Sequence, residues 1–264
     1  MEINLIIGYL LAVLVGVSLG LIGSGGSILS VPILVYVIKI EPVLATAYSL
    51  FIVGNTALVG GIIKAREKLV DFKKVVLFGI PTVLSVFITR MFLLPRIPVK
   101  IIIGDYFILK SNLIMVVFAI VMFFAAIRMI KPINNIIVND DDKINYFKIS
   151  LQGIFIGFIA GFVGAGGGFL IVPALLFLAK TPMKMAVGTS LFIVASQSLI
   201  GFIGDLSIIK NIDWKMLLLF TSLSVVGFFI GNIVSKKISG EKLKTGFGYF
   251  VLAMAIYIII KELF

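Results

Sequence analysis

Residues 23–34 read GSGGSILSVPIL, and residues 164–175 read GAGGGFLIVPAL. A shift of 141 residues aligns 16–34 with 157–175, and nine of the 19 aligned pairs are identical. Five of these pairs are Gly and one is Pro, which apolar composition alone would not place in register. The same shift aligns SLFIV at 49–53 with SLFIV at 190–194. The chain is therefore an internal duplication, and each copy has a glycine-rich break.

The composition is that of a membrane protein. Of the 264 residues, 61% are apolar and 13% are charged, against roughly 45–50% and about 25% in soluble domains. This excludes an ordinary soluble enzyme, a disordered chain and a nucleic-acid-binding module. Because a span takes about 20 apolar residues, there is room for roughly eight spans and almost no extramembrane domain.

Continuous apolar runs without two-residue alternation predict helices rather than barrel strands. The runs at 27–38 and 168–179 have only 12 residues each. Such a helix reaches about 18 Å, short of a hydrocarbon core of about 30 Å, so both are expected to be half-helices. We expect an all-α polytopic membrane protein with repeats at 1–132 and 147–264 and a cytoplasmic linker at 133–146. Each repeat has a Gly-broken hairpin with a half-helix, followed by three transmembrane helices.

Charge distribution bears on the orientation of the two repeats. An inverted arrangement places 15 of the 23 Lys and Arg residues in the cytoplasm, whereas a parallel arrangement places 12 there. Because cytoplasmic loops are enriched in Lys and Arg, the sequence favours inverted repeats with both termini outside.

Several kinds of chemistry are excluded by missing residue types. The chain has no Cys and no His, so thiolate, imidazole and Cys- or His-ligated metal chemistry are absent. Asp140, Asp141 and Asp142 are adjacent, but nothing nearby completes a metal site. Arg90 lies four residues before the end of its apolar run and is expected to snorkel outward. No Asp or Glu is expected to be buried as a proton carrier, and no catalytic residue, metal or cofactor is predicted.

The two breaks are the candidate substrate site. Gly lets the backbone approach a ligand closely, and the free amides and dipole at the start of a helix favour an anion. Two such ends near mid-membrane, helped by polar side chains of the next span, are expected to bind one small anion. Close helix packing is the alternative role for these glycines. The candidate residues are Gly23, Ser24, Gly25, Gly26, Ser27, Ser49, Asn55, Gly164, Ala165, Gly166, Gly167, Gly168, Thr189, Ser190 and Gln197.

The doubled motif at 23–34 and 164–175 resembles the signature of the TauE/SafE family, the sulfite exporter or toluene sulfonate uptake permease family. The segment Ala186-Val187-Gly188-Thr189-Ser190-Leu191 is similar to a second pattern of that family, and the first half departs from it at 45–50. The resemblance covers essentially the whole chain. It implies a multi-pass transporter of the prokaryotic plasma membrane that moves a small sulfur-containing anion such as sulfite, thiosulfate or an organosulfonate. The expected partners are this anion and membrane lipid, not nucleic acid, and the sequence specifies no oligomeric state.

Other readings compete with a sulfur-anion transporter. Drug or metabolite exporters with inverted five-helix repeats share the duplication, but they do not predict the Gly-rich breaks. An intramembrane enzyme would need paired carboxylates or a Ser/Lys dyad, and the acidic residues lie at loops and span ends. A purely structural membrane subunit is the remaining alternative.

Overall fold

The protein is described from a computed structural model that covers residues 2–23, 26–103, 106–130, 146–164, 167–177, 181–206, 209 and 211–263. The linker predicted at 133–146 lies outside these residues up to 145, and so do Asp140, Asp141 and Asp142. In the first half the elements are α1 (Glu2–Ile22), α2 (Gly26–Pro32), the π-helical η1 (Ile33–Val37), α3 (Pro42–Arg66), α4 (Phe72–Ile88), the π-helical η2 (Thr89–Leu93), α5 (Leu94–Arg96), β1 (Lys100–Ile103), β2 (Tyr106–Leu109) and α6 (Lys110–Ile130). In the second half they are α7 (Tyr146–Val163), α8 (Gly168–Phe177), α9 (Met183–Leu206), α10 (Trp214–Ser235) and α11 (Gly240–Leu263).

The expected all-α membrane architecture is confirmed. Among the described residues, six helices are long and apolar enough to cross a membrane: α1, α3, α4 with its extension to Arg96, α6, α9 and α10. The half-helices follow the two breaks as predicted, since α2 with η1 and α8 are both short. One element was not expected: β1 and β2 form an antiparallel hairpin between α5 and α6.

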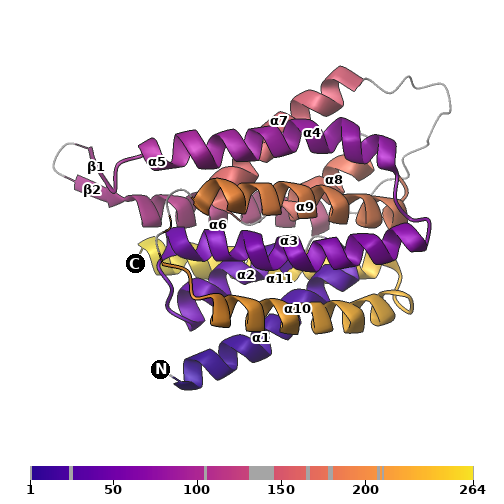
Figure 1. The fold of residues 1–264 in the computed structure, drawn as a ribbon, viewed down its shortest axis with the longest axis horizontal. Coiled ribbons are helices and arrows are strands. Elements are labelled where there is room, and N and C mark those ends of the chain that lie inside the picture. Colours follow the sequence, from indigo (N-terminus) through magenta and orange to yellow (C-terminus); the bar gives the residue numbers. More distant parts are fainter. Residues whose placement is uncertain are drawn as a thin grey trace.

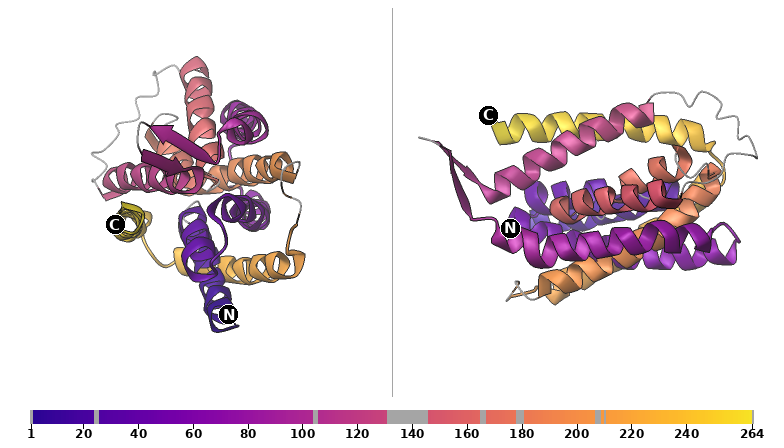
Figure 2. Two further views of the ribbon diagram at one scale, coloured as in Figure 1. Left: turned by 90° about the vertical axis from the view of Figure 1, so that its left-hand side faces the viewer. Right: turned by 90° about the horizontal axis from the view of Figure 1, so that it is seen from above.

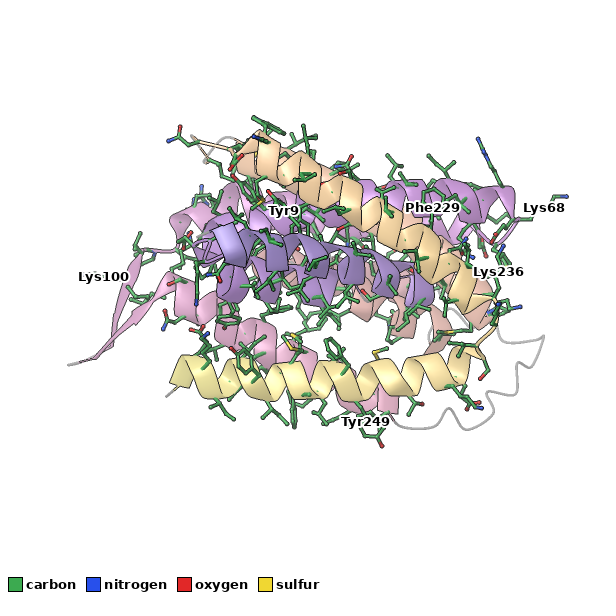
Figure 3. The ribbon with its side chains drawn as sticks, turned by 90° about the horizontal axis from the view of Figure 1, so that it is seen from below. Tyr9, Lys68, Lys100, Phe229, Lys236 and Tyr249 are labelled. Atoms are coloured by element: carbon green, nitrogen blue, oxygen red, sulfur yellow. The ribbon has the colours of Figure 1, made fainter. Side chains whose placement is uncertain are left out.

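The bundle has two distinct ends. Both chain termini and the β-hairpin lie at one end, which we call the termini end (Figure 1, Figure 2). Lys68 and Lys236 lie at the opposite end, which we call the Lys68 end, and Lys100 of the hairpin projects from the termini end (Figure 3). Of the loops that the inverted arrangement assigns to the cytoplasm, those at 64–74 and 235–244 are therefore at the Lys68 end.

The two halves are interlocked by helix pairs that exchange partners between repeats. α1 packs against α10 of the other half, and α7 packs against α4. The α1–α10 contact uses small residues on both helices, because a Cβ at Gly16, Gly20, Gly227 or Gly231 would collide with the facing backbone. Close packing is therefore the role of these glycines, as is common between membrane helices.

α3 and α9 form the centre of the bundle. They run antiparallel, because Gly61 faces Phe192, Gly54 faces Leu199 and Gly201 faces Leu50. Thr46 and Asp205 consequently lie near the termini end of this pair, and Lys64 lies near its other end. From Thr46 to Lys64 the pair is about 27 Å long at 1.5 Å per residue. This antiparallel central pair and the exchanged partners support inverted repeats, which stay a prediction.

Candidate functional site

The first glycine of each break has the same backbone conformation and lies beside corresponding residues of the other half. Gly23 has φ +79° and Gly164 has φ +71°, a left-handed conformation that only Gly adopts without cost. A Cβ on Gly23 would meet Val187 of α9, and a Cβ on Gly164 would meet Thr46 of α3. The two breaks thus begin at opposite ends of the α3–α9 pair.

Each break then leads back into the bundle. A Cβ on Gly167, which has φ +55°, would lie 3.3 Å from Nε2 of Gln197, and Gln197 is in the middle of α9. α8 therefore begins inside the bundle beside a fully buried amide side chain. In the first half, the Ser30 hydroxyl of α2 is hydrogen-bonded to the Ser49 hydroxyl of α3. The structure thus brings the predicted residues Gly167 and Gln197 together, and it places Ser49 against a half-helix.

Other predicted site residues have partners of their own. Asn55 donates to the Phe51 carbonyl of its own helix at 2.8 Å, and Ser190 donates to Val187 at 2.8 Å. The Thr189 hydroxyl accepts a hydrogen bond from the Asp71 amide at 3.0 Å. Asn55 and Ser190 therefore donate to carbonyls of their own helices, and Thr189 binds the N-cap residue of α4. Gly26 and Gly168 begin α2 and α8, and both are buried. The candidates Ser24, Gly25, Ala165 and Gly166, and the side chain of Ser27, lie outside the described residues.

Two expectations for charged residues were wrong: that Arg90 snorkels outward, and that no Asp or Glu is buried. Arg90 is 0% exposed. Asp205 does lie at the end of a span, the last turn of α9, but it is only 3% exposed. Nη1 of Arg90 donates to Oδ2 of Asp205 at 2.8 Å and to Oγ1 of Thr46 at 3.2 Å. The pair joins η2 to α9, because η2 directly continues α4 and both α4 and η2 pack against α9. A buried carboxylate is therefore present where the sequence predicted none.

The sequence carries a signal for Arg90 as a functional candidate, although not for its contact with Asp205. An ionisable residue within an apolar span is a candidate functional residue, and a partner of opposite charge should be sought for it. Arg90 lies within an apolar segment, but its proximity to the segment end suggested snorkelling instead, and Asp205 lies just beyond the end of its apolar segment. The repeat carries a further signal, because the 141-residue shift pairs Asp205 with Lys64. The two halves therefore carry unlike charges at corresponding positions.

A cationic pocket opens at the Lys68 end, beside the first break. It has a volume of about 300 Å³ and includes Lys64, Lys184, Lys236, Glu67 and Val187 in its lining, and Val187 is the residue that Gly23 approaches. Glu67 bridges Lys64 at 2.9 Å and Lys236 at 3.0 Å. Burial alone would raise the pKa of Glu67, but the hydrogen bonds and charges of the two lysines lower it below its usual value. Three lysines against one carboxylate give the pocket a positive charge that suits an anion.

Comparison with known proteins settles the family. Residues 8–258 match the family described as “Sulfite exporter TauE/SafE”. The chain belongs to the TauE/SafE family. The resemblance of the doubled glycine motif is thereby confirmed, and the family assignment replaces the drug or metabolite exporter alternative.

Relatives of this TauE/SafE protein carry transporter names. A “Probable membrane transporter protein” of Xylella fastidiosa (strain 9a5c) is 31% identical over 254 residues, covering 93% of this chain and 91% of the relative. A “Probable membrane transporter protein YunE” of Bacillus subtilis (strain 168) is 27% identical over 262 residues and covers 89% of each chain. No solved structure matches the chain. The protein is therefore a multi-pass membrane transporter of the TauE/SafE family.

Proposed function

We propose that this protein is a secondary transporter that moves a small sulfur-containing anion, such as sulfite, thiosulfate or an organosulfonate, across the prokaryotic plasma membrane. The observation that carries the proposal is the second break, where α8 begins inside the bundle beside the buried amide of Gln197. The first amides of a helix lack intrahelical partners, and together with the helix dipole they favour negative charge. The choice of a sulfur-containing anion as the substrate rests on the description of the family as a sulfite exporter family.

We infer that transport occurs by alternating access, and the exchange of helix partners between the halves supports this mechanism. The first break begins beside the lysine-lined pocket at the Lys68 end, and the second begins near the termini end. If the halves are inverted repeats, rocking α1 and α10 against α4 and α7 exchanges the environments of the two breaks. The anion would then be exposed to one membrane face at a time.

Uptake of radiolabelled sulfite and thiosulfate into proteoliposomes tests the proposal. The wild-type protein should transport at least one of these anions above empty liposomes, with unlabelled organosulfonates competing. Gln197→Leu keeps the side-chain volume similar and removes the amide, so transport should fall about tenfold, the cost of one or two lost hydrogen bonds. Gly246→Ala is the matched control, since a Cβ there would meet nothing within 4 Å. Wild-type protein that transports cationic drugs and no sulfur anion would refute the proposal.

A further inference from the structure

The Arg90 guanidinium has only one of its three nitrogens engaged among the described residues. Nη1 binds Asp205 and Thr46, whereas Nε and Nη2 are buried and have no hydrogen-bond partner in the described part of the chain. An unsatisfied buried donor is costly, and more so when it is charged. A fully buried cation with two donors open among the described residues is a candidate anion receptor.

One of the open donors, Nη2, lies at the second glycine break. A Cβ on Gly164 would collide with Nη2 of Arg90, so only Gly at this position leaves the guanidinium its place. Nε and Nη2 share one edge of the planar guanidinium, and their N–H bonds are spaced to bind two oxygen atoms of one ligand. Carboxylates, phosphates and other oxyanions match this fork.

The backbone at Arg90 also departs from regular helix. Arg90 belongs to η2, a π-helical segment that directly continues α4. π-helical turns are rare and are frequent at functional sites. Here the π-helical turn accompanies the burial of Arg90 between α3 and α9.

The ion pair is not a requirement of the fold, because the duplicated half lacks it. From Asp71 onward the repeat shift is 142 residues, so Arg90 corresponds to Asn232, and Asp205 corresponds to Lys64 by the 141-residue shift. Thr46 corresponds to Val187. Asn232 is uncharged and cannot form an ion pair with Lys64. The helices that carry these two residues, α10 and α3, nevertheless pack together as α4 and α9 do.

We infer that Arg90 is the residue that binds the transported anion, taking two of its oxygens on Nε and Nη2 while Asp205 and Thr46 hold Nη1. This inference rests on the proposed transport function and adds its anion receptor. Asp205 keeps the guanidinium in place and neutralises it when no anion is bound. Because its negative charge opposes that of the anion, it also favours release.

Anion-dependent thermal stability of the purified full-length protein tests this assignment. The probes are sulfite, thiosulfate, sulfate, phosphate and acetate, each compared with chloride at equal ionic strength. The neutral double variant Arg90→Gln/Asp205→Asn leaves no unpaired buried charge, so it should fold. Its affinity for the anion that stabilises the wild type should fall about tenfold or more, the cost of losing charge-assisted hydrogen bonds.

Two single variants and a control separate binding from structure. Arg90→Lys keeps the charge but loses the fork, so it should also weaken anion binding. Asp205→Asn removes the competing carboxylate and should enlarge the anion-induced rise in Tm. Asn232→Ala, at the position equivalent to Arg90, should bind the anion as the wild type does.

Each outcome bears on one of the two proposals. A double variant that binds the anion as tightly as the wild type would overturn the role of Arg90, and so would a wild type stabilised by none of the five anions. Stabilisation by phosphate or acetate alone, lost in the Arg90 variants, would support Arg90 as the receptor and refute the sulfur substrate.

Discussion

Gly164 has a left-handed backbone conformation and also lies against the buried guanidinium of Arg90. Its φ of +71° costs a residue with a side chain about 1 kcal/mol or more, and the new Cβ would collide with Arg90 and Thr46. Gly164→Ala should therefore destabilise the protein by more than about 1 kcal/mol and reduce transport. Gly246→Ala in α11 should instead stabilise by up to about 1 kcal/mol, because Ala has the higher helix propensity. Thermal unfolding in detergent and proteoliposome uptake measure both; equal stability of the two variants would contradict the role of Gly164.

The sequence predicted the two glycine-rich breaks, but it did not predict that Arg90 faces the second break at Gly164. Glycines in register at Gly23 and Gly164 are visible in a single chain because the duplication repeats them. Arg90 meets Asp205 only through packing between α3, α4 and α9, and the two residues are 115 positions apart. Periodicity along one helix carries no information on such a contact, so the apolar run alone led to the wrong expectation of a snorkelling side chain.

The helix ends at the Lys68 end are joined by Glu67, the C-cap residue of α3. It links α3 to Lys236, which follows α10, and its pKa is lowered by the two lysines against the opposing effect of burial. A lowered carboxylate pKa stabilises the folded state above the unfolded value and loses this effect as pH falls through the folded value. Glu67→Gln should therefore lower stability at pH 7 by up to about 1 kcal/mol. The difference from wild type should vanish once the pH falls below the lowered pKa of Glu67, and a gap in Tm that persists with Glu67 protonated would contradict the argument.

At the scale of elements, long apolar runs were sufficient to predict the helices. The half-helices were predicted from run length and the preceding glycines, and both begin where the breaks end. The repeat also extends to helix caps that the apolar pattern did not reveal: Asp71 caps α4 and Asp213 caps α10 through equivalent side-chain bonds. The β1–β2 hairpin was missed, because the sequence analysis considered apolar runs of helical length and left 95–110 between two of them.

For the whole molecule, orientation in the membrane can be tested without background, because the chain has no Cys. Lys68 and Lys100 are both exposed and lie at opposite ends of the bundle (Figure 3). The excess of Lys and Arg in loops assigned to the Lys68 end predicts that this end is cytoplasmic. A membrane-impermeant maleimide applied to intact cells should label Lys100→Cys and spare Lys68→Cys until the membrane is permeabilised. The cysteine-free wild type is the control for nonspecific labelling. Labelling of Lys68→Cys alone from outside would reverse the orientation, and labelling of both would contradict a single orientation; either result would remove the charge-based support for inverted repeats with both termini outside.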